Sequence, residues 1–138
     1  MDDALARLTS EWLTKGWHDL QAARITSNAA NGPLDIAIYH CQQSAEKSVK
    51  GWLVARNIPF EKTHDVRRLI KQAAAVLPEF DRFTGAAEVL TPYVSAFRYP
   101  GLSDDAMPSR EEFRIALQHA EAIYDFVLSL LPPEARPK

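Results

Sequence analysis

The sequence predicts an all-α fold, an up-and-down bundle of four long helices plus a shorter fifth helix. Apolar residues recur three and four positions apart along most of the chain, which is the spacing of amphipathic helices. No stretch combines strand-like alternation with flanking tight-turn signals. The connections are short, which favours antiparallel neighbours. A length of 138 residues suits one domain with a substantial core, so we expect a single domain over 1–138.

The first two helices are bounded by strong stop signals. We expect the first from about Asp3 to Ala30, ended by the triplet Asn31-Gly32-Pro33. Glycine is favoured just past a helix end, and proline does not continue a helix. The second is expected from about Leu34 to Arg56, before the Asn57-Ile58-Pro59-Phe60 segment.

A third helix is expected from His64 to Val76, with Thr63 as its N-cap, because threonine side chains accept hydrogen bonds from free first-turn amides. A fourth is expected from about Asp81 to Phe97. Pro92 lies inside this stretch and should kink or break it, since proline removes a backbone donor.

The last helix is expected to begin after Ser109, which stands three residues before Glu112 and can form a capping box with it. It should end near Leu131, where Pro132 and Pro133 follow. We expect a short exposed tail from about residue 132.

Composition excludes several classes of protein. Hydrophobic residues make up 46% and charged residues 25%, which is typical of globular domains and argues against disorder. A net charge of −2 argues against a broad nucleic-acid surface but leaves a local basic patch open. The single cysteine, Cys41, falls at an apolar helical position, which excludes an intrachain disulfide or a cysteine-based zinc site.

No apolar run is long enough for a membrane-spanning helix, and the start Met1-Asp2-Asp3 lacks a signal pattern, so we expect no membrane association and a cytoplasmic location. There is no glycine-rich phosphate loop and no zinc-binding histidine pair. The histidines lack the spacing of metal ligands on one helical face, so we expect neither a metal nor a cofactor.

The second predicted helix carries a polar stripe formed by Gln43, Lys47 and Lys50, at positions i, i+4 and i+7. Two ammonium groups and an amide on one face are suited to binding a phosphate chain. The same stripe also fits a solvated face or a dimer surface. Glu46 and Lys50 form an i, i+4 pair worth only about 0.2–0.5 kcal/mol on a helix surface.

Two further positions are candidates for ligand contact. His64 begins a predicted helix, where the dipole disfavours a protonated imidazole, so we expect a neutral ring that donates to a buried partner. The alternative is that it packs against a neighbouring helix. Arg98 and Tyr99 together form a suitable pair for an anion and a base, although an arginine near a helix C-terminus also complements the dipole.

Four segments carry a family resemblance. They are Trp17-His18-Asp19-Leu20, Tyr39-His40-Cys41-Gln42-Gln43-Ser44-Ala45-Glu46-Lys47-Ser48-Val49-Lys50, Thr63-His64-Asp65 and Arg98-Tyr99-Pro100. In this order they resemble the HEPN family, the higher eukaryotes and prokaryotes nucleotide-binding domain. The resemblance implies a five-helix bundle, often dimeric and often encoded beside a minimal nucleotidyltransferase in toxin–antitoxin-like modules. It favours a binding partner of such a transferase, with nucleotide contacts from Gln43, Lys47, Lys50, His64, Arg98 and Tyr99.

Ribonucleases of the wider HEPN superfamily carry an arginine followed after four to six residues by a histidine, and Arg114 and His119 resemble this pattern. The alternative function is therefore a metal-independent toxin ribonuclease acting on RNA, with His119 moving a proton and Arg114 stabilising phosphate charge. Ile115 stands where those nucleases have a polar residue. A five-residue offset also turns the two side chains about 140° apart on an ideal helix, so they would converge only across a dimer or with local distortion.

A third hypothesis is a ligand-free oligomerisation scaffold. Trp12, Trp17 and Trp52 lie on helices that a small bundle cannot wholly enclose, and aromatic residues are enriched at interfaces. We therefore expect a homodimer, although all three tryptophans would equally suit the core.

Overall fold

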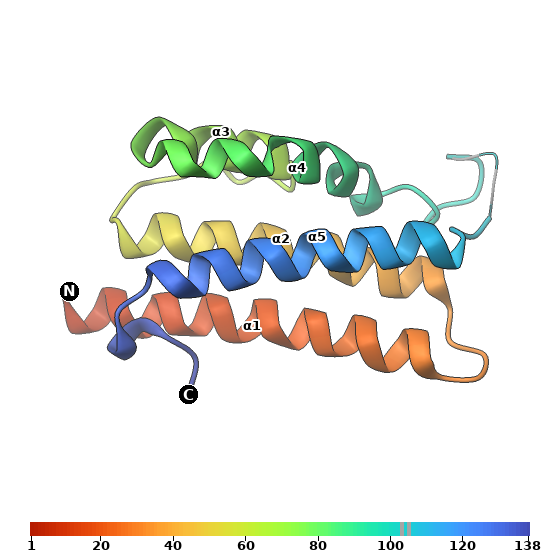
Figure 1. Ribbon diagram of the computed structural model, residues 1–138, viewed down its shortest axis with the longest axis horizontal. Helices are drawn as coiled ribbons and strands as arrows, with labels where there is room; N and C mark the ends of the chain where they lie inside the picture. Colours follow the sequence, from red (N-terminus) through yellow and green to blue (C-terminus); the bar gives the residue numbers. More distant parts are fainter. Residues whose placement is uncertain (103, 105) are drawn as a thin grey trace.

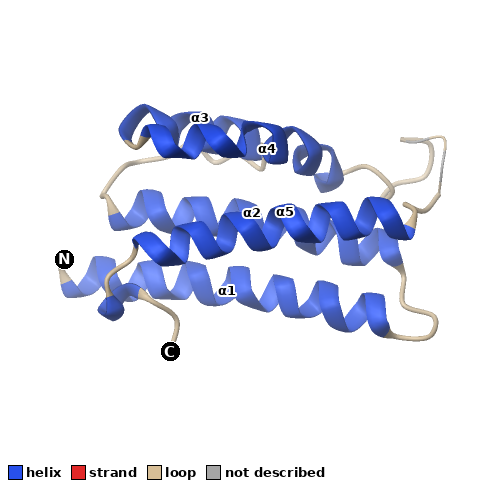
Figure 2. Cartoon of the chain, in the orientation of Figure 1, coloured by secondary structure: helices blue, strands red, loops and turns tan. Residues whose placement is uncertain are grey.

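The computed structural model describes residues 1–102, 104 and 106–138, and within these ranges all regular structure is helical (Figure 2). The α-helices are α1 (Asp3–Asn28), α2 (Leu34–Ala55), α3 (Val66–Val76), α4 (Thr84–Leu90) and α5 (Arg110–Leu130). Three 3₁₀ turns accompany them: η1 (Pro78–Phe83), η2 (Thr91–Val94) and η3 (Pro133–Ala135). The predicted all-α class with five helices is confirmed.

The helices form a bundle in which α2 is the central element. Figure 1 shows α1 along one side of α2 and α5, with α3 and α4 forming a layer on the opposite side. The packed face of α1 follows the helical repeat through Ala6, Leu13, Leu20 and Ala23, all of which are buried. Because α2 contacts α1, α3 and α5, most of its residues are buried, including polar ones.

The stop signals around α1 and α2 act as predicted. α1 ends at Asn28 and α2 begins at Leu34, on either side of the Asn31-Gly32-Pro33 triplet. Asp2 caps α1 by accepting hydrogen bonds from the amides of Ala4 and Leu5.

The predicted start of the third helix is wrong by two residues. The N-cap is Asp65, whose carboxylate accepts from the amide of Arg67, and helical structure begins at Val66. Thr63 instead accepts from the amide of Asp65 and stabilises the preceding turn. Thr63 and Asp65 are both suitable N-cap residues, and Asp65 is the cap because α3 begins directly after it. His64 therefore lies before the helix.

The predicted fourth helix, Asp81 to Phe97, is divided into η1, α4 and η2, and only seven residues of it are α-helical. Pro78 begins η1, and Pro92 lies in the first turn of η2. Pro92 has no amide hydrogen to continue the α-helical ladder, so the backbone tightens into a 3₁₀ turn there. The segment turns at Phe97, whose φ of 68° is in the left-handed region.

The C-terminal tail has exposed residues, Pro133, Glu134, Arg136 and Lys138, but it also contacts the bundle. Leu131 and Ala135 are buried, and η3 packs against α1. The Ser10 hydroxyl donates to the carbonyl of Arg136 at 3.0 Å. The capping box at the start of α5 is confirmed, with Ser109 and Glu112 bonded reciprocally.

Cys41 is a core residue, as predicted. Its side chain is fully buried, and burial raises the pKa of the thiol to about 12, which keeps it protonated and unreactive near neutral pH. None of the described helices is both long and apolar enough to cross a membrane.

Candidate functional site

A buried polar cluster on α2 is the main chemical feature of the structure. Glu46 is 3% exposed and Lys50 is 7% exposed, and Gln42 and Gln43 are buried beside them. Burying these groups removes them from water at considerable cost, so they require internal partners.

Glu46 is the central acceptor of this cluster, and Gln42 Oε1 additionally accepts from Gln43 Nε2 at 2.7 Å. Glu46 Oε2 accepts from Lys50 Nζ at 3.1 Å, one helical turn away. Its Oε1 accepts from Gln42 Nε2 at 3.2 Å and from Gln43 Nε2 at 3.4 Å. The ammonium of Lys50 also lies 5.4 Å from the ring centre of Phe60 and 5.9 Å from that of Trp12, within reach of cation–π attraction.

His64 joins this cluster from the segment before α3. Its Nδ1 lies 2.9 Å from Glu46 Oε1, so an Nδ1–H can donate to the buried carboxylate. The predicted hydrogen bond to a buried partner is therefore present. The His64 carbonyl accepts from Gln42 Nε2 at 2.8 Å, while the imidazole itself remains 69% exposed.

A second cluster joins α1 to α2 around Asp19, which is 6% exposed. Asp19 Oδ1 lies 2.7 Å from His40 Nδ1, and Asp19 Oδ2 accepts from Lys47 Nζ at 2.7 Å. The side chains of His40 and Lys47 are 28% and 27% exposed, so they lie at the edge of the bundle.

The polar stripe predicted on the second helix is therefore divided between two carboxylates. Gln43 and Lys50 belong to the Glu46 cluster and Lys47 to the Asp19 cluster. The alternative of a solvated face is wrong for Gln43 and Lys50, because both are buried. The Glu46–Lys50 pair is a core ion pair rather than a surface one.

Arg98 and Tyr99 form a third group near the start of α2. The Arg98 guanidinium lies 3.8 Å from the ring centre of Tyr39 and 5.4 Å from that of Tyr99. Arg98 also donates to the carbonyl of Val94, which secures the chain after η2. Both residues line a cavity of about 480 Å³ that also includes Asp35 and Phe97.

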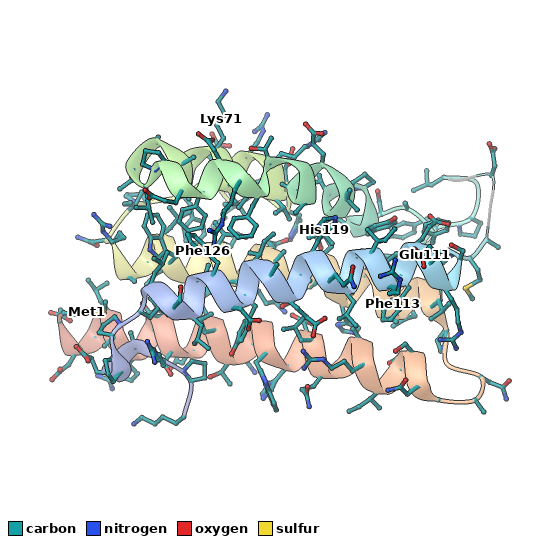
Figure 3. The ribbon with its side chains drawn as sticks, viewed as in Figure 1. Met1, Lys71, Glu111, Phe113, His119 and Phe126 are labelled. Atoms are coloured by element: carbon teal, nitrogen blue, oxygen red, sulfur yellow. The ribbon has the colours of Figure 1, made fainter. Side chains whose placement is uncertain are left out.

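The arginine and histidine of the nuclease-like pattern are not brought together. Arg114 is exposed and pairs with Glu111, and this bond raises the pKa of the arginine and lowers that of the carboxyl. His119 is half-buried near the middle of α5, and Glu111 lies near its beginning (Figure 3). No hydrogen bond links Arg114 to His119 among the described residues.

Within the described ranges, no group of three or more His, Cys, Asp or Glu side chains is placed to hold a metal ion.

The model of the HEPN domain family matches residues 9–130 of this chain. The protein belongs to the HEPN family. A crystal structure titled as an archaeal HEPN homologue superposes with a TM-score of 0.70, covering 88% of this chain and 96% of the homologue. At 23% identity this likeness shows the fold alone. Comparison with curated proteins gives no match.

Four residues of the Glu46 and Asp19 clusters were absent from the predicted ligand contacts: Asp19, His40, Gln42 and Glu46. The i, i+4 spacing of Glu46 and Lys50 was visible in the sequence but fits a surface pair equally well. Asp19 and His40 are 21 residues apart, and only the packing of α1 on α2 joins them. No local pattern would have identified that contact.

Proposed function

We propose that this HEPN domain is a non-catalytic, dimeric binding partner of a minimal nucleotidyltransferase in a toxin–antitoxin-like module. Membership of the family supports the proposal. The observation that supports its non-catalytic part is that Arg114 and His119 are not joined within one chain, where Arg114 instead binds Glu111. One side chain is exposed and bonded to Glu111, and the other is half-buried on a different face of α5.

The test is co-expression with a minimal nucleotidyltransferase encoded beside this chain, followed by size-exclusion chromatography with light scattering. We expect a stable complex that contains two copies of the HEPN chain. A HEPN chain that stays alone and monomeric at micromolar concentration would remove the partner and dimer parts of the proposal.

A ribonuclease assay on the purified chain tests the non-catalytic part. We expect no cleavage of RNA by the parent protein and no difference on substituting His119→Ala. Metal-independent cleavage that disappears in both Arg114→Ala and His119→Ala would instead establish the ribonuclease alternative.

The proposal also includes a cytoplasmic location and a nucleotide as the small ligand. Tyr99 is 54% exposed beside the guanidinium of Arg98, an arrangement that suits stacking of a base near a phosphate-binding cation. Lys47 is the more exposed of the two α2 lysines.

Calorimetric titration with ATP tests this ligand. We expect saturable heat that Tyr99→Ala and Lys47→Ala each reduce. Lys15→Ala, which removes an exposed lysine of α1 outside the proposed contacts, is the matched control. A loss in the control lysine variant equal to that in Lys47→Ala would indicate non-specific attraction between charges rather than a site.

A further inference from the structure

The pairing of an exposed imidazole with a buried carboxylate sets His64 apart from the other exposed histidine, His18. The His64 side chain is 69% exposed, whereas that of its partner Glu46 is 5% exposed. His18 is also exposed, but no hydrogen bond joins its ring to a carboxylate among the described residues. We propose that His64 is a nucleophilic histidine whose free Nε2 accepts a phosphoryl group from a small phosphoramidate donor.

The first support is the orientation of the ring. Because Nδ1 donates to Glu46 Oε1 at 2.9 Å, the neutral tautomer carries its proton on Nδ1 and its lone pair on Nε2. Nε2 has no hydrogen-bond partner among the described residues, and its ring is open to solvent. A carboxylate that holds an imidazole in one tautomer is a recurring way to prepare the other nitrogen for chemistry.

The second support is the rigidity of the arrangement. Gln42 holds the carbonyl of His64 at 2.8 Å, so α2 binds both the backbone and the ring of this residue. Glu46 is itself held by Lys50 through its other oxygen. A nucleophile fixed at both ends loses little conformational freedom when it reacts.

The chemistry balances with the groups present and the donor. The Nε2 lone pair attacks phosphorus, the nitrogen–phosphorus bond to the donor breaks, and the donor nitrogen leaves as ammonia. The product ring carries the phosphoryl group on Nε2 and a proton on Nδ1, and is therefore cationic. The Glu46 carboxylate beside Nδ1 stabilises that charge, as the aspartate does in a serine protease triad.

The charges around His64 also suit a phosphoryl group. The segment 61–71 contains four cations, Lys62, Arg67, Arg68 and Lys71, against two acids, Asp65 and Glu61, which pair with Arg67 and Arg68. The whole chain, by contrast, has a net charge of −2. All four cations are exposed. This local excess of positive charge would attract the anionic donor and offset the charge of the product.

The experiment treats the intact purified protein with potassium phosphoramidate near neutral pH and locates the label by peptide mass spectrometry under alkaline conditions. We expect His64 to be labelled at least about tenfold faster than His18 in the same molecules. Phosphorus and nitrogen NMR should place the group on Nε2 alone. Equal rates at the two histidines, or attachment at Nδ1 of His64, would overturn the proposal.

Glu46 is the positioning residue in this scheme, and E46Q tests it. We expect labelling of His64 to fall to the rate of His18 and to include the Nδ1 product, because the amide no longer requires a proton on Nδ1. Circular dichroism and the rate at His18 report whether the variant remains folded. Labelling in folded E46Q that keeps the parent rate and position at His64 would show that the carboxylate contributes nothing.

If E46Q fails to fold, the comparison of His64 with His18 in the parent decides the proposal alone. The experiment needs no partner protein. Its failure would therefore leave the transferase-partner proposal intact, and failure of that proposal would leave this one.

Discussion

At the scale of single residues, the core ion pair between Glu46 and Lys50 is costly to bury. Both ions lose most of their hydration, and only their mutual attraction and the surrounding donors offset that loss. Stability alone therefore does not explain the pair, because well-packed apolar residues of similar volume often make a fold equally stable. The Glu46 carboxylate of this pair also contacts His64, so the pair forms part of the proposed site.

Removing one member of this pair should destabilise the fold strongly. For Lys50→Met we expect a loss of about 3–5 kcal/mol in unfolding free energy, because Glu46 remains buried without its cation. The double variant Glu46→Leu with Lys50→Met should recover most of that loss, since no buried charge is left. Urea unfolding measures all three proteins.

The control for this series is Lys47→Met, whose side chain is 27% exposed at the edge of the Asp19 cluster. Lys47→Met should lower the unfolding free energy clearly less than Lys50→Met does. A double variant as unstable as Lys50→Met alone would contradict the ion-pair account.

At the scale of helices, α3 depends on its N-cap. Asp65 accepts from the amide and the guanidinium of Arg67, and these bonds lower the pKa of its carboxyl below the ordinary 3.8. A carboxyl whose pKa is lower in the folded state stabilises the fold above its unfolded pKa. That stabilisation is lost as the pH falls through the folded pKa.

We therefore expect Asp65→Ala to lower stability by about 1 kcal/mol near neutral pH. The difference in unfolding free energy between parent and variant should narrow once the pH falls below the ordinary carboxyl pKa of 3.8. Asp65→Asn keeps a capping oxygen, so it should cost less and show little pH dependence. Chemical denaturation of the three proteins across pH provides the test, and a gap unchanged at acidic pH would refute the role of the carboxylate.

The contact between α1 and α2 is close because small residues line it. A methyl group added at Gly51 would overlap the side chain of Leu13 and approach Trp12 Cβ to 3.0 Å. Gly85, in α4, has no atom within 4 Å of the same position.

These two glycines form a matched pair. We expect Gly51→Ala to destabilise the protein by about 1–3 kcal/mol through overpacking. Gly85→Ala should stabilise it by about 0.5–1 kcal/mol through helix propensity. Thermal unfolding distinguishes the two signs, and a Gly51→Ala protein as stable as the parent would show that α1 and α2 can separate freely.

At the scale of the whole molecule, the two ends of the chain lie at the same end of the bundle (Figure 1). The segment after α5 turns back along α1, so Leu131 and Ala135 are covered. The C-terminal segment thereby completes the core that α1 and α5 begin.

Deleting residues 132–138 should therefore lower stability. We expect a loss of about 1–2 kcal/mol from uncovered apolar surface and from the hydrogen bond of Ser10 to Arg136. Deleting only Pro137 and Lys138 is the control and should change little. Differential scanning calorimetry compares the three chains, and equal melting temperatures would mean that the tail contributes nothing to the fold.

The sequence by itself determined the all-α class, the five helices, the Asn31-Gly32-Pro33 stop and the Ser109–Glu112 box. These features depend on local periodicity and on caps within one turn, which neighbouring residues specify. Among candidate site residues, His64 and its hydrogen bond to a buried partner were predictable. Its partner was not.

Only the tertiary structure decided which polar residues are buried and what they bind. Lys47 and Lys50 are three positions apart, yet one pairs with Asp19 of α1 and the other with Glu46. The helical repeat places a side chain on a face but does not specify which element covers that face. Burial turns Glu46 and Lys50 from a weak surface pair into the centre of a site, because a charge removed from water must find its partners within the fold.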